Sequence, residues 1–238
     1  MFNFDKNILF RDAMILVINK PSGVAVHRGM GKGSHLEDVL KNLTFGLPNP
    51  PQLAHRLDAG TSGCLVLGRH KTALTRLGHL FKDGHINKTY LAIVNGSPAD
   101  DIGVIDLPLA KQSTFKHRWW MKVCPDGMVS RTEYRVLYRG NDQTTLVELT
   151  PITGRTHQLR VHCQAMGFPI RGDAIYGTKK INEPPLLHLH AQSVNIPLYS
   201  KKPPIYVTAE LPDHIIQTCV EADITLASPI VHTYEHKD

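Results

Sequence analysis

The sequence has few cysteines and no long apolar run, and both shortages narrow the class of protein. Four cysteines are spread along 238 residues without a C-x-x-C pair or a repeated spacing, which excludes the dense disulfide framework of a small secreted domain. The longest early apolar run, AMILVI at 13–18, is far shorter than the roughly 18 residues that a membrane span requires. It is also too short for the signal sequence of an exported protein. We therefore expect reduced thiols, no membrane segment and a cytoplasmic location.

The sequence also lacks internal repeats, low-complexity tracts and Gly/Ser linkers. Hydrophobic residues make up 42% and charged residues 20%, which are ordinary values for a folded chain and argue against disorder or a coiled coil. We predict one main domain over residues 1–212. Residues 213–238 differ, since five acidic residues and one lysine give them a charge of −4, and we expect a frayed or loosely attached acidic tail.

Positive charge dominates the rest of the chain, because the overall charge of +6 becomes +10 once the tail is set aside. A basic body suits a polyanionic partner without identifying it. Within it, the segment 111–122 contains Lys116 and Arg118 and no acidic residue, with Trp119 and Trp120 among the charges. Basic residues attract phosphates and aromatic rings stack on unpaired bases, so the segment fits a nucleic-acid contact. A partly buried hairpin with a solvated basic edge explains the same pattern, and both interpretations stay open.

Apolar and alternating patterns predict more strands than helices. Strands are expected at 13–18, 64–68, 88–96, 129–138, 144–150, 190–196 and 205–211. Helices are expected at 71–85 and 157–166, where apolar residues recur at helical spacing. One glycine lies near the C-terminal end of each helix. Because hairpins outnumber βαβ units, we predict an α+β fold with a mixed, mostly antiparallel β-sheet flanked by helices.

The densest group of reactive side chains is HRLDAGTSG at 55–63, just before a buried strand. A Gly- and Ser-rich loop that abuts a strand can hold Asp58 exposed but rigid. Its carboxylate is ionised at neutral pH and can attack an electrophile without a helper base. The competing interpretation is that Asp58 caps a turn and that Arg56 is its surface partner.

A second group, GRTHQLRVH at 154–162, places four basic or imidazole side chains on or beside one short helix. Arg155, His157, Arg160 and His162 are candidates to bind phosphates near the positive helix N-terminus. Alternatively, Arg160 reaches back to Asp58 and holds its carboxylate ionised. A third possibility is that these charges are simply solvated.

Fourteen histidines raise the question of a metal site. His188 and His190 form an H-x-H pair, but no Asp, Glu or Cys set completes a recognised metal-ligand spacing. The sequence also has no P-loop and no G-x-S-x-G motif. We therefore predict no metal and no nucleotide cofactor.

Several of these segments together resemble the RluA family of pseudouridine synthases. HRLDAGTSG is similar to the signature that carries the catalytic aspartate of that family. Four other segments resemble family blocks and stand in the family's order: NKPSG at 19–23, KTYLA at 88–92, GRTHQLRVH at 154–162 and PIRGDAIYG at 169–177. The resemblance therefore covers about residues 8–211. The resemblance overturns the turn-cap interpretation of Asp58, and it implies the pseudouridine synthase fold over residues 1–212.

The resemblance implies a role for each matching residue. Asp58 is the nucleophile that adds to the ribose of a target uridine, Tyr90 packs on the target base and helps to remove the carbon 5 proton, and Arg160 pairs with the catalytic carboxylate. Arg56 matches the residue that moves into the RNA stack when the base leaves it. The remaining residues expected to bind RNA are His55, Lys88, Arg155, His157, Lys116, Arg118, Trp119 and Trp120.

The implied substrate is ribosomal RNA, transfer RNA or both. Some members of the family carry an S4-type RNA-binding domain before the catalytic domain, and we expect none in this chain, which resembles the smaller members. We expect a monomer. Two alternatives are weighed against the enzyme: a catalytically silent RNA-binding or RNA-folding factor on the same scaffold, and a histidine-dependent metallohydrolase.

Overall fold

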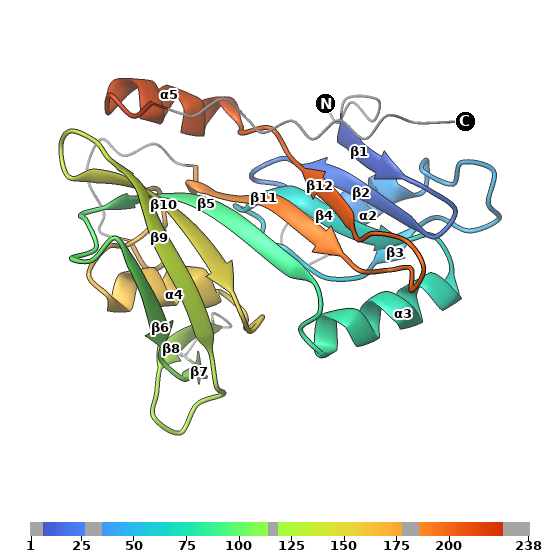
Figure 1. Ribbon diagram of the computed structural model, residues 1–238, viewed down its shortest axis with the longest axis horizontal. Coiled ribbons are helices and arrows are strands. Elements are labelled where there is room, and N and C mark those ends of the chain that lie inside the picture. The colour runs from blue at the N-terminus through green and yellow to red at the C-terminus, as the bar shows by residue number, and fades with distance from the viewer. Residues whose placement is uncertain (1–6, 27–34, 114–118, 178–185, 226–238) are drawn as a thin grey trace.

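The computed structural model describes residues 7–26, 35–113, 119–177 and 186–225. Most of its strands join one large sheet, with strand order β1-β2-β4-β11-β5-β10-β9-β6 (Figure 1). β3 pairs with β4, and β12 pairs with β11. The strands are β1 Ile8–Arg11, β2 Ile15–Lys20, β3 Gln52–Leu53, β4 Ser62–Gly68, β5 Asn87–Asn95, β6 Ile102–Asp106, β7 Leu109–Ser113, β8 Trp119–Val123, β9 Arg131–Arg139, β10 Thr144–Pro151, β11 Leu189–Ile196 and β12 Ile205–Thr208. The helices are α2 Leu36–Leu40, α3 Lys71–Lys82, α4 Gln158–Ala165 and α5 Asp213–Glu221.

Every pairing between the described strands is antiparallel except that of β11 with β4. The predicted α+β class and mixed, mostly antiparallel sheet are therefore confirmed. β11 lies between β4 and β5 and joins two groups of strands, one near the N-terminus and one in the middle of the chain (Figure 1).

Alternation along the central strands builds a core on each face of the sheet. Leu16 and Leu65 point to the face that α2 and α4 cover, whereas Val17 and Val66 point to the face that α3 covers. All residues of β4 are buried, because its strand has neighbours on both sides and cores above and below. This rigid strand follows directly after the loop that carries Asp58.

The expectation of a frayed tail is wrong for residues 213–225. α5 packs on the sheet, and its Ile215 and Cys219 form a core cluster with Ile93 and Leu146. Spacing explains the error, since the buried residues of this helix recur three and four apart among acidic and polar neighbours. Residues 226–238 lie outside the described part of the chain.

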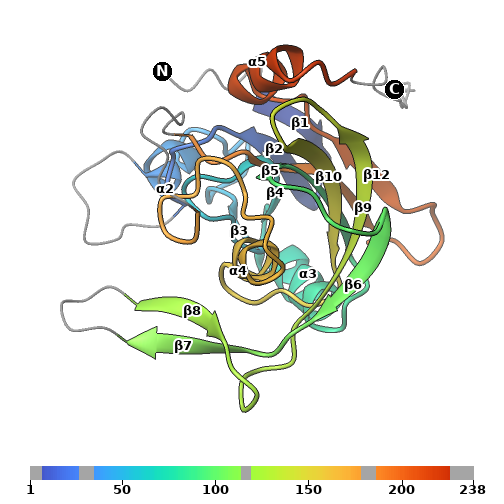
Figure 2. The same ribbon diagram turned by 90° about the vertical axis from the view of Figure 1, so that its left-hand side faces the viewer.

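The basic and aromatic segment of the sequence belongs to a hairpin, β7–β8, that lies apart from the large sheet (Figure 2). Leu109 and Met121 of this hairpin bury their side chains against Val161 of α4. The hairpin is thus attached to the body through α4. Residues 114–118, between the two strands, lie outside the described residues.

One glycine explains how the Asp58 loop joins the sheet. Gly63 has a φ of +102°, and a Cβ atom at this position would lie 2.2 Å from the carbonyl oxygen of Ala191. Because only glycine lacks that atom, β11 can approach β4 closely at the end of the loop.

In the part of the chain that the structure describes, no helix has the length and apolar character to cross a bilayer.

Candidate active site

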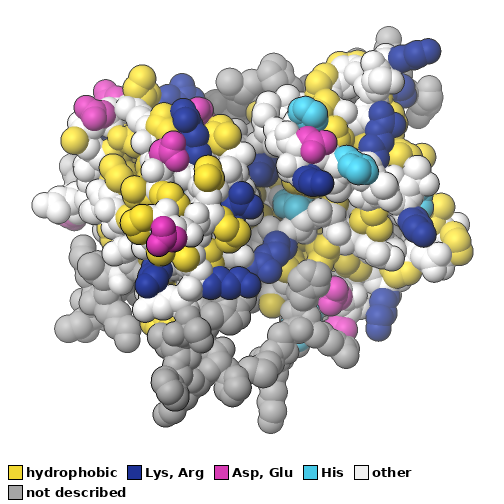
Figure 3. Space-filling view, turned by 90° about the horizontal axis from the view of Figure 1, so that it is seen from below, with side chains coloured by type: hydrophobic (Ala, Val, Ile, Leu, Met, Phe, Trp, Pro, Cys, Tyr) yellow, Lys and Arg dark blue, Asp and Glu magenta, His cyan; other side chains and the backbone are white. Residues whose placement is uncertain are grey.

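A cavity of about 590 Å³ opens on one face of the molecule. Figure 3 shows this face hollowed between its two halves, with Lys and Arg side chains along the hollow. The walls come from the Asp58 loop, the end of α3, the start of β5, and the segment that connects β10 to α4. Eight residues singled out from the sequence line it: His55, Arg56, Asp58, Lys88, Tyr90, Arg155, His157 and Arg160.

Asp58 lies at the inner end of this cavity. Its side chain is 19% exposed, and its Oδ2 atom lies 3.1 Å from Nη1 of Arg160 and 3.7 Å from Nε2 of His157. Thr61 donates its backbone N–H to the Asp58 carbonyl and closes the turn. Among the described residues, neither nitrogen contacts Oδ1, so the lone pairs of this oxygen are not used by these two partners.

Arg160 is itself held by a second carboxylate. Its Nε and Nη2 donate to the two oxygens of buried Asp173 at 2.7 and 2.8 Å. Asp173 also accepts the backbone N–H groups of Ile175 and Tyr176. Burial opposes the charge of Arg160, but the bidentate bond to Asp173 outweighs it and raises the pKa of the guanidinium. Arg160 therefore remains a fixed cation beside Asp58.

The structure shows the second of the interpretations offered for the 154–162 group, the contact between Arg160 and Asp58. The other polar residues of α4 hold the preceding loop in place. Gln158 accepts the hydroxyl proton of Thr153 and the N–H of Arg155, while His162 binds the hydroxyl of Thr132. Both Gln158 and His162 are buried, so they are not the solvated surface residues of the third interpretation.

Tyr90 forms the inner wall of the cavity from β5. Its neighbours across the ladder are Leu149 and Ala191, so its ring has apolar strands on both sides. Burial raises the pKa of Tyr90, and the negative charge of Asp58 raises it further. The side chain is thus a neutral phenol that presents a ring next to the carboxylate.

Lys20, which received no role from the sequence, is hydrogen-bonded to the Asp58 loop through the carbonyl of Ala59. Its side chain is fully buried, and Nζ donates to the carbonyl oxygens of Pro21, Val24 and Ala59 at 2.8, 2.9 and 3.0 Å. Burial lowers its pKa to about 7, and the charge of Asp58 opposes that fall. Three carbonyl partners match the three donors of the ammonium group. The NKPSG block was the signal, but a buried lysine cannot be recognised from it.

Lys20→Met should loosen the loop. Three partly buried carbonyls would lose this ammonium donor, although the carbonyl of Ala59 would still accept the N–H of Gly23, and we expect the free energy of unfolding to fall by about 1–3 kcal/mol. Urea denaturation measures this loss. Lys201→Met, at an exposed position, is the control and should change stability by less than about 0.5 kcal/mol. Equal stability of the two variants would contradict the anchoring role.

The predicted RNA-binding residues around the cavity fall into two kinds. His55 is turned inward, since its Nε2 accepts the N–H of Val66 at 2.9 Å and burial lowers its pKa to about 3. It fastens the loop to β4. Arg56 and Arg155 are exposed at the rim, where Arg56 donates to the Thr156 hydroxyl at 3.1 Å.

The remaining predicted RNA-binding residues are Lys88, which lines the cavity, and those of the hairpin. Lys88 is half-buried on β5, and burial lowers its pKa. Trp119 and Trp120 begin β8, and Trp120 is half-buried. Lys116 and Arg118 lie outside the described residues. The RNA contact expected of this segment stays a prediction.

The described residues contain no group of three His, Cys, Asp or Glu side chains placed to hold a metal ion. The H-x-H pair has other partners. His188 bonds to the Thr218 hydroxyl and His190 to the Ser62 hydroxyl. Burial lowers the pKa of each to about 4, so both imidazoles are neutral hydrogen-bonding groups within the core.

Comparison with known proteins agrees with this geometry. Residues 14–165 match the family described as RNA pseudouridylate synthase. An uncharacterized RNA pseudouridine synthase of Zymomonas mobilis is 41% identical over 208 residues, or 87% of this chain and 93% of that protein. The dual-specificity RNA pseudouridine synthase RluA of Yersinia pestis is 40% identical over 79% of this chain and 91% of its own length. The solved structure of human RNA pseudouridylate synthase domain containing 4 has a TM-score of 0.77 and 28% identity, covering 93% of this chain and 95% of that one.

Proposed function

The chain belongs to the family of RNA pseudouridine synthases and is an isomerase of uridine in RNA, and we propose that Asp58 is its covalent nucleophile. The observation that supports this role is the contact between Asp58 and Arg160 at the inner end of the cavity. One carboxylate oxygen is held by the guanidinium, while the other faces no protein donor among the described residues. The proposed substrates are ribosomal RNA, transfer RNA or both.

The proposed reaction moves one bond of the uridine. Asp58 forms a bond to the ribose as the glycosidic bond from carbon 1′ to N1 breaks, and the electron pair stays on the uracil. The uracil then rotates, and a bond forms from its carbon 5 to carbon 1′ while Asp58 leaves. Carbon 5 loses its proton and N1 gains one, so no atom or electron is gained or lost overall. The sequence of steps requires no metal or redox group.

Tyr90 serves in this proposal as the surface against which the uracil lies. Its raised pKa keeps the hydroxyl protonated. Tyr90 therefore suits the role of a neutral platform that relays a proton better than that of a permanently charged phenolate base. The residue is largely buried on β5, with Leu149 and Ala191 as its cross-strand neighbours. The uracil turns against this ring between the two bond-making steps.

Arg56 supports entry of the base. A stacked uridine cannot reach Asp58 from inside a helix, so the enzyme must flip it out at a cost of a few kcal/mol. Arg56 is exposed at the rim and is tied to Thr156 by one hydrogen bond. It is therefore free to leave that contact and fill the space that the flipped base vacates.

The hypothesis of a silent RNA-binding factor has no observation in its favour, since such a protein has no need of a buried Arg160–Asp173 pair aimed at Asp58. The deciding experiment uses total RNA from cells that lack the gene, labelled with tritium at uracil carbon 5. Purified protein should release tritium from this RNA and not from RNA of wild-type cells. Fractionation into ribosomal and transfer RNA then identifies the substrate. Binding without release from any fraction would overturn the proposal.

A further inference from the structure

We propose that Tyr176 and His157 form a hydrogen-bonded relay that ties the orientation of the Asp58 carboxylate to the position of β8. Neither Tyr176 nor the backbone of β8 touches Asp58 directly. Both act through His157, whose ring lies between Tyr176 and the carboxylate. The inference rests on the proposed role of Asp58, and it adds two positioning residues to it.

The first link is the hydroxyl of Tyr176. It accepts the backbone N–H of Met121, in β8, at 2.9 Å. It also lies 2.8 Å from Nδ1 of His157. A phenol has one proton to give, and His157 Nδ1 is the acceptor that the described residues place within its reach. In the proposed relay, Tyr176 donates this proton to His157 and accepts from Met121.

The second link follows from the tautomer of His157. A neutral imidazole that accepts at Nδ1 carries its proton on Nε2. Nε2 faces Oδ2 of Asp58 at 3.7 Å, which is longer than a hydrogen bond but short enough to tighten when the site closes on a substrate. Burial lowers the pKa of His157, which favours this neutral form. The N–H then points at the oxygen that Arg160 also binds, and leaves Oδ1 for the substrate.

The backbone of His157 has an uncommon conformation. Its φ of 53° and ψ of 16° lie in the left-handed region, which is uncommon for a residue with a side chain. Gln158 fixes the neighbouring loop by binding Thr153 and the N–H of Arg155. The unusual conformation places the imidazole between Tyr176 and Asp58 instead of in solvent.

Tyr176 also contacts the other partner of Asp58. The guanidinium of Arg160 lies over its ring, 5.1 Å from the centroid. A displacement of Tyr176 thus reaches Asp58 by two routes, through His157 and through Arg160. The hairpin that carries Met121 is the same one that bears the basic and aromatic segment 111–122. A displacement of this hairpin would therefore change the orientation of the Asp58 carboxylate.

Tyr176→Phe tests the relay, because it removes the hydroxyl and keeps the ring under Arg160. We expect the single-turnover rate of tritium release from the labelled total RNA to fall about tenfold, the effect of one hydrogen bond lost in the transition state. The enzyme concentration that gives half the maximal rate should change less than twofold. Nitrogen-15 NMR of the free protein should show His157 protonated at Nε2 in the wild type and as a tautomer mixture in the variant.

His157→Asn is the second variant, since asparagine tolerates the left-handed conformation but cannot reach Asp58. It should lose rate as Tyr176→Phe does, and the double variant should lose no more than either single one. Tyr138→Phe, at an exposed site on β9, is the control and should change neither rate nor tautomer. An unchanged rate and tautomer in Tyr176→Phe would overturn the relay. If the wild type released no tritium, the proposed function would fail while the NMR result still judged the relay.

Discussion

Asp58→Asn is expected to reduce tritium release by at least about 10⁴-fold while RNA binding stays within about twofold of the wild type. The amide has the size of the carboxylate but lacks the nucleophilic oxygen, so the first bond to the ribose cannot form. Arg160 keeps its bidentate contact with Asp173 and should stay in place. A single-turnover release assay with excess enzyme measures the rate, and a filter-binding assay with the same RNA measures affinity.

The control for this substitution is Asp126→Asn, which makes the same chemical change at an exposed position in the turn after β8. Its release rate should match the wild type within about twofold. Release by Asp58→Asn at more than about one hundredth of the wild-type rate would show that another group forms the bond to the ribose. The catalytic role of Asp58 would then be abandoned.

Arg160→Met is expected to lower the free energy of unfolding by about 3–5 kcal/mol and to abolish most of the activity. Asp173 is buried and would keep only the N–H groups of Ile175 and Tyr176 as donors. Burial alone raises the pKa of this carboxyl, and Arg160 is what brings it below its usual range. Without the guanidinium, both carboxylates of the site lose their cation. Urea denaturation and the release assay measure the two effects.

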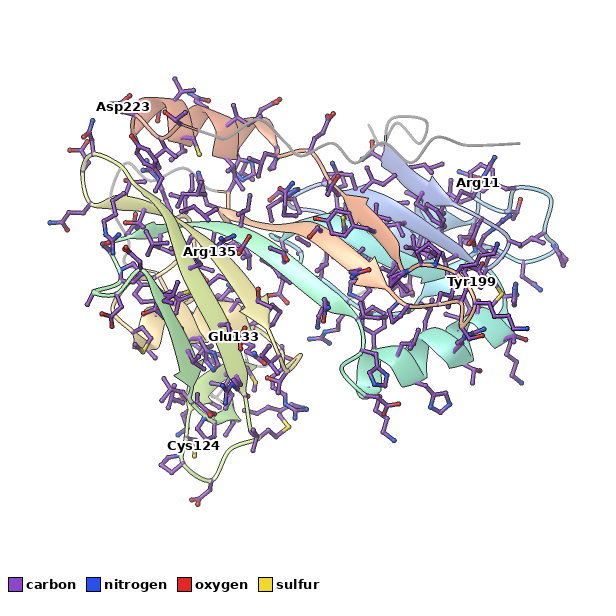
Figure 4. All side chains as sticks on the ribbon, viewed as in Figure 1. Arg11, Cys124, Glu133, Arg135, Tyr199 and Asp223 are labelled. Carbon is purple, nitrogen blue, oxygen red and sulfur yellow. The ribbon has the colours of Figure 1, made fainter. Side chains whose placement is uncertain are left out.

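Arg135→Met provides the matched control at a surface ion pair. Arg135, labelled on β9 in Figure 4, donates to Glu148 at 2.9 Å, and its side chain is 59% exposed. Because solvent screens this pair, its loss should cost less than about 1 kcal/mol and leave activity unchanged. Similar losses of stability in the two variants would mean that the Arg160–Asp173 pair contributes no more than an exposed one.

The sequence was sufficient for the elements whose pattern is local. Apolar runs identified β2 and β4, and helical spacing identified α3, each within a few residues of its observed bounds. The Asp58 loop was found through its reactive composition and its place before a buried strand. The same reasoning missed α5, because its buried stripe is short and mixed with acidic residues. Local patterns predict an element only when apolar residues dominate its buried side.

The partnerships within the site could not be derived from local patterns. Asp58 and Arg160 are 102 positions apart, and their contact was only one of three interpretations of the basic group before the family resemblance was considered. Asp173 and Tyr176 received no role, although they stand in a recognised block, because nothing in that block shows which side chains turn inward. Lys20 is the extreme case, since a lysine is rarely fully buried. Long-range packing decides the partners of all five residues.

The place of β11 in the sheet has a consequence for the order in which the protein is made. β11 pairs with both β4 and β5, and it joins the strand group next to the Asp58 loop to the group next to α4. It is also nearly the last strand to leave the ribosome, after Asp58 and Arg160 have both been synthesised. Until residues 189–196 emerge, none of the strands that the structure describes before them pairs with both β4 and β5. Asp58 and Arg160 are thus translated well before the strand that joins the two strand groups beside which they lie.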